Sequence, residues 1–184
     1  MIKYGNDYIL IKNIREENIS KCVKARRINQ ASFLGKVVSD SESEKWIRLH
    51  AENSNNILLE IIYRPLDCFI GTIGFVKQNN RIEVGRLSLY SHAIKELIRA
   101  GVNPKRLHKV MQMVCGLSID YLFKHTDAEL LFCNVLENNR LSNALCTQLP
   151  GGIPQKIQQE FEGIPKDVLH YELTRAEYLE RGKK

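Results

Sequence analysis

The chain of 184 residues is 43% hydrophobic and 26% charged, with a formal net charge of +6. This is the composition of an ordinary globular domain and not that of a disordered or low-complexity chain. No apolar run reaches the length of a membrane span, and the opening MIKYGNDYIL lacks the apolar segment of a secretory signal. We therefore expect one cytoplasmic domain over residues 1–184, with no membrane partner.

Cysteine and histidine are scattered along the chain without a recognisable spacing. The five cysteines include no C-x-x-C pair, which argues against a disulfide framework and against a zinc site. They are Cys22, Cys68, Cys115, Cys133 and Cys146. His50, His108, His125 and His170 also lack metal-ligand spacing. The sequence thus predicts free thiols and no metal.

The first part of the chain predicts one strand followed by two helices. YILIKNI, Tyr8 to Ile14, alternates as a strand does, and REENISKCVKARRIN carries the apolar stripe of a helix. After the loop ASFLGKVV, Ser41 and Glu44 have the spacing of a capping box. This spacing places the start of the second helix in SESEKWIRLHAENS.

Three apolar segments follow in quick succession. They are NILLEIIYRP (56–65), DCFIGTIGFVKQNN (67–80) and RIEVGRLSLYS (81–91). The turns between them are short, so we expect an antiparallel meander of the second, third and fourth strands.

The last of these three segments, which is the predicted fourth strand, changes phase in its middle. Ile82 and Val84 point to one face, and a strict period of two would send Leu87 and Leu89 to the other. A β-bulge at Gly85 would restore the register and leave backbone groups unpaired for a ligand. The alternative is a strand without a bulge that is buried on both faces.

The longest helix signal runs from about Asn103 to His125, where apolar residues recur every three or four positions. An extra helical turn, SHAIKELI, precedes it. AELLFCNVL (128–136) is a nearly continuous apolar run, as in a strand covered on both faces. A strand–helix–strand crossover of this kind makes the fourth and fifth strands parallel.

The C-terminal part predicts a short helix and two strands. NNRLSNALCTQL forms the helix, which Pro150-Gly151-Gly152 should end. Strands follow at about 156–161 and 168–174, and the polar tail RAEYLERGKK should fray.

The start of the long helix is unusually basic. Asn103 is a good N-cap and Pro104 suits the first helical position. Lys105, Arg106 and Lys109 then add positive charge where the helix dipole is already positive, which is unfavourable without an anion. The segment is therefore either a phosphate site or a solvated basic turn.

The order of these elements resembles the GNAT superfamily of acetyl-CoA-dependent N-acetyltransferases over nearly the whole chain. IGTIGFV (70–76) is similar to the family's third strand, and EVGRLSLY (83–90) to its bulged fourth strand. VLENNRLSNALCTQLPG (135–151) resembles the family segment in which an Asn and a short helix follow the fifth strand. ARRINQASFLGKVVSDSESEKWI looks like the entrance of the branch that acetylates protein N-termini and nucleotide-linked amino sugars.

This resemblance implies an α+β fold with α/β/α layers. The central sheet would be mixed but mostly antiparallel, with about six to seven strands and a V-shaped opening between strands four and five. Acetyl-CoA would be the co-substrate, with no metal. Its contacts would come from Leu87, Ser88, Leu89, Arg99, Gly101, Val102, Asn103, Lys105, Arg106, Asn139 and Ser142. The family's phosphate loop, Q/R-x-x-G-x-G/A, is matched here only by Arg99, Gly101 and Asn103.

The same resemblance suggests catalytic residues. Glu83 lies where the family often has its general base, and it is otherwise an exposed strand charge. Tyr90 and His92 lie near the expected thioester and could carry a proton. Cys146 falls where the family often has a Tyr general acid, and its alternative role is packing in the core. For Asn139 the alternative is capping the short helix.

The predicted function is transfer of acetyl from acetyl-CoA to a primary amine by direct attack. A nucleotide-linked amino sugar is preferred to a polyamine, and a protein N-terminus stays open as acceptor. The alternative is a non-catalytic GNAT-shaped module that binds CoA or a partner. Nucleic acid is not expected, because the basic residues Lys21, Lys24, Arg26 and Arg27 lack interleaved aromatics. The sequence leaves a homodimer open.

Overall fold

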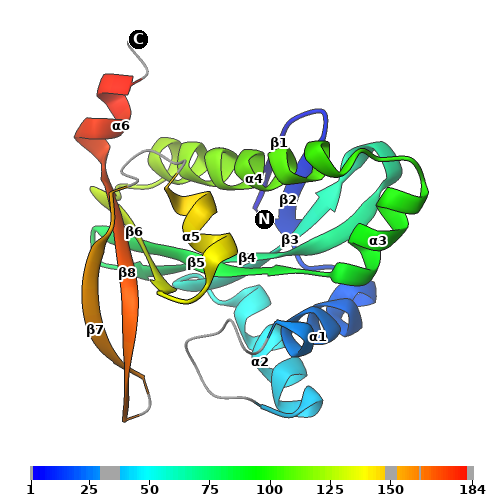
Figure 1. Cartoon of the computed structure of the whole chain (residues 1–184), viewed down its shortest axis with the longest axis horizontal. Coiled ribbons are helices and arrows are strands. Elements are labelled where there is room, and N and C mark those ends of the chain that lie inside the picture. Colours follow the sequence, from blue (N-terminus) through cyan, green and yellow to red (C-terminus); the bar gives the residue numbers. More distant parts are fainter. Residues whose placement is uncertain (1, 30–37, 148–152, 162, 182–184) are drawn as a thin grey trace.

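The computed structural model describes residues 2–29, 38–147, 153–161 and 163–181 (Figure 1). Within these ranges the strands form one eight-stranded sheet in the order β1-β2-β3-β4-β5-β6-β8-β7. Their bounds are β1 Lys3–Gly5, β2 Ile9–Asn13, β3 Asn56–Tyr63, β4 Cys68–Gln78, β5 Arg81–Leu89, β6 Leu130–Leu136, β7 Gln155–Phe161 and β8 Ile164–Thr174. All neighbouring strands pair antiparallel except β5 and β6, which are parallel. The predicted mixed, mostly antiparallel sheet is therefore confirmed.

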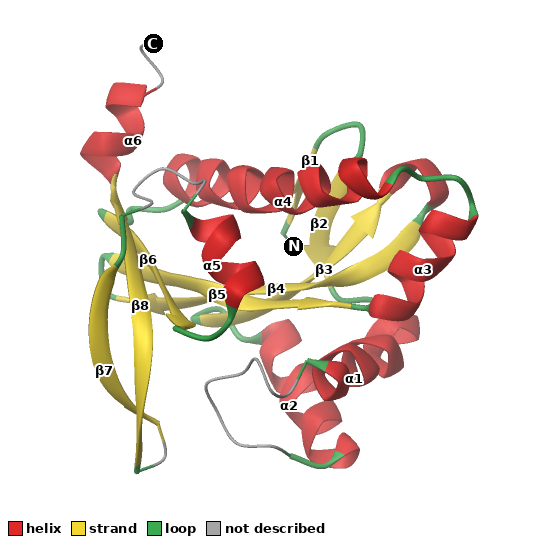
Figure 2. Ribbon diagram, viewed as in Figure 1, coloured by secondary structure: helices red, strands yellow, loops and turns green. Residues whose placement is uncertain are grey.

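Helices cover both faces of the sheet. They are α1 Ile19–Ile28, α2 Asp40–Glu52, α3 Ser91–Arg99, α4 Pro104–His125, α5 Arg140–Cys146 and α6 Arg175–Arg181, with 3-10 turns η1 Glu16–Asn18 and η3 Arg64–Leu66. Figure 2 shows α4 on one side of the sheet and α1 with α2 on the other. The helices thus form the outer layers of the predicted α/β/α arrangement.

Two apolar clusters hold these layers together. The larger one lies between the sheet and α4, where Val110, Val114 and Leu122 pack against strand residues such as Ile61 and Ile73. These α4 positions recur at the spacing of one helix face, which is why the sequence pattern predicted the helix. The smaller cluster lies under α1 and α2 and contains Ile19, Cys22, Val23, Ile47, Leu58, Ile62 and Phe69.

The capping box of α2 lies two residues earlier than predicted. The Oγ of Ser39 accepts the N–H of Glu42 at 3.2 Å, and the Glu42 carboxylate accepts the N–H of Ser39 at 2.8 Å. The predicted pair, Ser41 and Glu44, lies inside the helix, where Glu44 forms an ion pair with Arg48 instead. Both pairs have the same sequence spacing, and only the backbone geometry distinguishes them.

The predicted bulge in β5 is confirmed, but it involves Arg86 and not Gly85. Gly74 pairs with Gly85 and Thr72 with Ser88, so two residues of β5 face the single Ile73 of β4. The extra residue is Arg86, which has a left-handed φ of 54°. As the phase slip requires, Ile82, Val84 and Leu87 all pack against the cluster on the α4 face.

Strands β5 and β6 diverge soon after they meet. They pair at only three positions, from Arg81 with Leu130 to Glu83 with Phe132. Beyond this point β6 remains paired to β8 along its whole length, and β5 remains paired to β4. The part of β5 that follows Glu83 therefore has no strand partner on its β6 side. This is the V-shaped opening that the sequence predicts between its fourth and fifth strands.

Several predictions about the ends of elements were incomplete or wrong. The three-residue β1 was not predicted, and SHAIKELI is part of a complete helix, α3, instead of a single turn. The tail is helical through Arg181, because the Arg175 guanidinium donates to the carbonyls of Phe123, Thr126 and Ala128 at 2.7–2.8 Å. The predicted stop at Pro150-Gly151-Gly152 and most of the loop ASFLGKVV lie outside the described residues.

Candidate active site

A cleft of about 770 Å³ occupies the opening between β5 and β6. One wall is the unpaired part of β5, and the other consists of β6 and α5. On the α4 face, Leu107, Met111 and Cys115 reach into it, and on the opposite face Arg26 and Trp46 do. The cleft therefore passes from one side of the sheet to the other, which lets two molecules approach one point from opposite faces.

Seven of the predicted site residues line this cleft. They are Glu83, Leu87, Ser88, Leu89, Asn139, Ser142 and Cys146. The first four follow one another along β5, and the last three belong to α5 and its cap. These residues come from segments about fifty positions apart, and the β5–α4–β6–α5 crossover brings them together.

Glu83 lies at the vertex of the opening, as the last residue of β5 that pairs with β6. Its side chain is half-buried, and burial raises the pKa of its carboxyl, partly offset by the nearby positive charge of Arg86 and by His170. A carboxylate with a raised pKa inside a cleft can accept a proton from a substrate more readily than an exposed one. Glu83 therefore places a titratable carboxyl group at the vertex of the cleft.

Two thiols meet beside α5. The Sγ of Cys146 lies 3.6 Å from the Sγ of Cys133 on β6. Hydrogen bonding from Cys133 lowers the pKa of Cys146, whereas the same contact and burial raise the pKa of Cys133. Cys146 is therefore the thiol of this pair that exchanges a proton closer to neutral pH.

Asn139 caps α5, as one of its two sequence interpretations predicts. Its Oδ1 accepts the N–H of Ser142 at 3.2 Å. The capping bond uses one of the two lone pairs of this oxygen, and the amide nitrogen of Asn139 has two hydrogens to donate. The side chain can therefore cap the helix and contact a molecule in the cleft.

The predicted phosphate segment has few backbone groups to offer in this structure. The N–H of Gly101 donates to Ile98 O at 3.0 Å, and the N–H of Val102 to Leu97 O at 2.9 Å. At the start of α4, the Oδ1 of Asn103 accepts the N–H of Lys105 at 2.9 Å. The exposed Arg99 forms an ion pair with Glu96. A phosphate on these amides would compete with contacts inside the chain.

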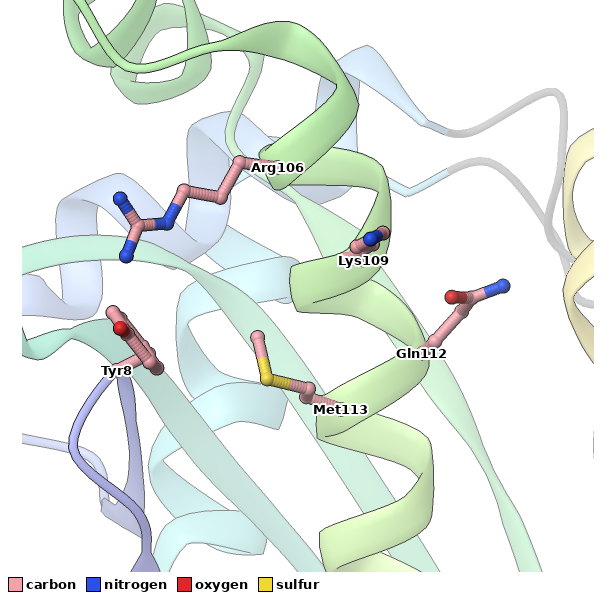
Figure 3. A pocket seen from close by; sticks show the side chains of 5 residues that line it. All are labelled: Tyr8, Arg106, Lys109, Gln112 and Met113. Atoms are coloured by element: carbon pink, nitrogen blue, oxygen red, sulfur yellow. The ribbon is translucent and has the colours of Figure 1, made fainter.

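The side chain of Arg106 points to a different part of the surface. Together with Lys109, it lines a separate cavity of about 520 Å³. The other lining residues are Tyr8, Gln112 and Met113 (Figure 3). The Arg106 guanidinium carbon lies 4.6 Å from the centre of the Tyr8 ring. This cation–π contact stabilises one of the basic residues of α4, so no bound anion is needed to explain its position.

Tyr90 and His92 lie at the far end of β5, outside the residues that line the cleft. The Tyr90 ring packs 6.0 Å from Phe69 and 5.8 Å from His92, and His92 is exposed. Tyr90 is also the N-cap residue of α3, to which it gives no side-chain hydrogen bond.

Comparison with solved structures identifies the architecture. A GCN5-related N-acetyltransferase from Brucella melitensis matches with a TM-score of 0.69 and 12% identity, over 97% of this chain and 80% of that one. The apo form of FdhC, a nucleotide-linked sugar GNAT, matches with a TM-score of 0.67 and 14% identity, over 99% and 95%. Spermidine N-acetyltransferase from Vibrio cholerae, in complex with CoA and spermine, matches with a TM-score of 0.68 and 14% identity, over 95% and 99%. The chain has the GNAT fold.

At these identities the likeness shows the GNAT fold and leaves the activity to be argued from the site. No family model matches the sequence, and no curated protein does either. Among the described residues, no helix is long and apolar enough to cross a membrane. The same part of the chain contains no group of three or more His, Cys, Asp or Glu residues arranged for a metal ion.

The structure adds cleft residues that the sequence did not single out for a site. On β8, Tyr171 lines the cleft near Cys146 and Cys133. Burial raises the pKa of Tyr171 to about 12, and its hydroxyl donates to Asn143 Oδ1 at 3.2 Å.

A second group of added residues comes from α1, α2 and β5 on the opposite face: Arg26, Trp46 and Arg86. No sequence signal could have revealed these two groups of cleft residues. Each group joins strands or helices that come together only when the sheet forms and the helices pack on it.

Proposed function

We propose that the chain is an acyl-CoA-dependent N-acetyltransferase that transfers acetyl to a primary amine by direct attack. The observation that carries the proposal is the divergence of β5 and β6 directly after Glu83. It opens a cleft of about 770 Å³ with an unpaired strand edge, a carboxylate and a thiol in it. Such a cleft accommodates an extended acyl carrier on one face and an amine on the other.

The pantetheine arm of the carrier would lie along Leu87, Ser88 and Leu89. Since β5 has no strand partner there, its outward backbone groups face the cleft and can pair with an extended ligand in the way that an edge strand accepts another strand. The carbonyl of Leu89 is the exception, because it already accepts the Nδ2–H of Asn29 at 2.9 Å. An N–H of this segment would also polarise the thioester carbonyl as negative charge develops on its oxygen.

The amine would approach from the α1 and α2 face. Glu83 accepts the proton of the ammonium group, directly or through water, and the neutral amine attacks the thioester carbon. A C–N bond forms while the C–S bond breaks, and the sulfur leaves as a thiolate. The new amide nitrogen loses its second proton to water, and water returns a proton to Cys146 after Cys146 has protonated the thiolate. The half-buried carboxyl with its raised pKa supports the role of Glu83.

The leaving thiolate then needs a proton, and Cys146 is the donor that the site offers. The contact with Cys133 lowers the pKa of Cys146, whereas burial raises the pKa of Tyr171 to about 12, so Cys146 gives up its proton more readily. Proton transfer is most efficient between groups of similar pKa. Tyr171, with a pKa of about 12, is the poorer proton donor, and its single hydroxyl hydrogen is already donated to Asn143 Oδ1.

The phosphates of CoA would lie at the rim of the cleft, where Leu89, Ile94 and Leu107 line it. This rim is formed by the first turns of α3 and α4. Because no side chain caps α3, whereas Asn103 already caps α4, we expect α3 to contribute more of the amide contacts. Lys105 remains exposed near this rim and can add charge.

For the acceptor we propose the amine of a small molecule, with a nucleotide-linked amino sugar preferred and a protein N-terminus as the second class. The similar structures include enzymes described for a nucleotide-linked sugar and for spermidine, so the fold by itself does not select between them. The acceptor must be argued from the charge of the cleft.

Binding of acetyl-CoA tests the proposal first. At a hundredfold excess over its dissociation constant, a ligand of the native state stabilises it by about 2.7 kcal/mol. Thermal unfolding measured with and without acetyl-CoA would show this stabilisation. Dephospho-CoA and ADP serve as comparison ligands in the same measurement. Release of free CoA thiol upon addition of amines would then show transfer. Absence of any shift at millimolar acetyl-CoA contradicts the proposal.

The second candidate is a non-catalytic module of the same fold. The engaged amides of Gly101, Val102 and Lys105 favour it, because they leave little of the usual phosphate seat. This candidate predicts binding of a partner or of CoA without thiol release from any amine. Single-turnover measurements with the protein in excess over acetyl-CoA would separate it from a slow enzyme.

A further inference from the structure

Two arginines from different elements meet at one indole on the α1 and α2 face of the cleft. The guanidinium carbon of Arg26, on α1, lies 4.1 Å from the centre of the Trp46 ring. The guanidinium carbon of Arg86, in the β5 bulge, lies 5.0 Å from the same ring. All three side chains are half-buried and line the cleft. They are here called the Arg26–Trp46–Arg86 cluster.

Trp46 acts in this cluster as a platform. Its ring also stacks on the buried His50, with the ring centres 4.0 Å apart. Cation–π contact holds guanidinium groups over an indole better than over any other side chain. With His50 and two arginines around it, the indole is already in use and cannot stack freely on a nucleobase. Recognition at this point must therefore come from the arginines.

Arg86 is held in an uncommon conformation. Its backbone has a φ of 54°, and one of its terminal nitrogens donates to the Oδ1 of Asn56 on β3. Its side chain crosses β4 at Gly74, where a Cβ would lie only 2.8 Å from the Arg86 Cδ. Non-glycine residues rarely adopt this conformation, and those that do are frequent in ligand sites.

The electrostatic environment of the cluster is positive. Burial and the charge of Arg86 lower the pKa of Arg26, and burial lowers the pKa of Arg86. Burial lowers the pKa of His50, and the charges of Arg86 and Arg26 lower it further. The charge of Glu83 on the same strand partly offsets the effect of burial on the pKa of Arg86. Two half-buried guanidinium groups over one indole make this part of the cleft positive, which favours an anionic group there.

We propose that the Arg26–Trp46–Arg86 cluster binds an anionic group, a carboxylate or a phosphate, on the amine acceptor. The inference deepens the proposed function and rests on it. The cluster lies on the face from which the amine approaches, and Arg86 is only three residues from Glu83 on the same strand. An acceptor anchored there by its anion would present its amine toward Glu83. The same charges disfavour a polyamine.

Matched pairs of small amines test the proposal by activity. O-phosphoethanolamine is compared with ethanolamine, β-alanine with β-alaninamide, and spermidine serves as the polycation. We expect kcat/KM for acetyl transfer to be at least ~10-fold higher for the anionic member of one pair, as a charge-assisted contact provides. The pair that shows the larger ratio distinguishes phosphate from carboxylate. Equal use of both members in both pairs, or preference for spermidine, overturns the proposal.

Three variants assign the preference to the cluster. Arg26→Gln and Arg86→Gln should each reduce the ratio between anionic and neutral amines ~10-fold or more, mainly through KM of the anionic amine. Arg86→Lys should retain part of the ratio, because it keeps the charge and loses the fork of donors. Arg27→Gln is the matched control: Arg27 follows Arg26 on α1 but is exposed and paired with Asp40 at 3.0 Å. An unchanged ratio in both Gln variants contradicts the proposal.

Binding measurements separate this inference from the proposed function. Calorimetry with acetyl-CoA tests the carrier site, and it should give the same affinity for the native chain and for Arg26→Gln. Calorimetry with O-phosphoethanolamine and with β-alanine tests the cluster without any turnover. If acetyl-CoA fails to bind while one of these probes binds and Arg26→Gln removes that binding, the function fails and the anion site stands. If the protein transfers acetyl from acetyl-CoA but neither probe binds, the proposed function stands and the anion site fails.

Discussion

Gly74 of β4 makes room for Arg86 of the β5 bulge. A Cβ on Gly74 would lie 2.8 Å from the Arg86 Cδ, 3.2 Å from its Cβ and 3.0 Å from the carbonyl oxygen of Ile57. The glycine thus allows the arginine to lie flat across the strand and to reach both Trp46 and Asn56. One small residue in the middle of the sheet therefore shapes the acceptor side of the cleft.

Gly74→Ala should displace Arg86 and strain β4. Because the backbone oxygen of Ile57 cannot move as a side-chain end can, we expect a loss of about 1–3 kcal/mol in the free energy of unfolding. Urea denaturation measures it. Gly116→Ala is the matched control: no atom lies within 4 Å of its added Cβ in α4, so it should stabilise by about 0.5–1 kcal/mol. Equal stability of Gly74→Ala and the native chain would show that β4 has more room than the structure indicates.

Glu83→Gln should reduce activity and raise stability at neutral pH. Removal of a general base costs roughly 10²–10⁴-fold in rate. Burial raises the pKa of Glu83 above its ordinary value of 4.5, so its stabilising contribution is complete below that value and is lost as pH rises through the raised pKa. The variant and the native chain should thus unfold alike near pH 4, with the variant more stable near pH 8. Urea denaturation at both pH values checks this. A variant that is less stable at pH 8 would contradict the buried-carboxylate account.

Native Glu83 also predicts a shape for the pH–rate profile. The carboxylate must be ionised to accept a proton, so kcat/KM should rise with pH through a pKa above 4.5 and then level off. In Glu83→Gln this rise should be absent. A rise that persists in the variant would assign the titration to another group.

Cys146 should react with iodoacetamide faster than the buried thiols, and bound CoA should protect it. Its pKa is lowered by Cys133, whereas burial raises the pKa of Cys22 to about 12. Mass spectrometry of tryptic peptides, with and without CoA, measures each rate. Cys68 is the control, since it is half-buried but does not line the cleft, so CoA should not change its labelling. Equal protection of Cys68 and Cys146 would point to global stabilisation instead of contact.

Arg175→Ala should destabilise the chain by about 2–3 kcal/mol. Hydrogen bonds from a charged group are strong, and the carbonyl oxygens that accept them would lose their donor. Its guanidinium joins the end of α4 to the start of α6 through the carbonyls of Phe123, Thr126 and Ala128. Arg175→Lys should lose part of this, since an ammonium lacks the planar fork. Lys95→Ala, at an exposed site on α3, is the control and should change stability by no more than about 0.5 kcal/mol.

The local pattern of the sequence was sufficient for most elements. The three- and four-residue spacing of apolar residues predicted α4, and Asn103 and Pro104 marked its start. The change of phase from Val84 to Leu87 predicted a bulge in β5, because a half-buried strand must keep its apolar residues on one face. The same pattern could not say whether Gly85 or Arg86 takes the left-handed conformation, since that depends on the pairing with β4.

What the sequence by itself determined is the order of elements and the presence of a bulge in β5, because period and capping are local properties of consecutive residues. The predicted residues that line the cleft, from β5 and from α5, came from the family resemblance. The tertiary structure decided which distant side chains share the site. Trp46, Arg26 and Arg86 meet only because α1 and α2 pack on the face of β5, and Tyr171 reaches Cys146 only because β8 pairs with β6. Helix packing and strand pairing join segments far apart in the chain, and no local period records which segments will meet.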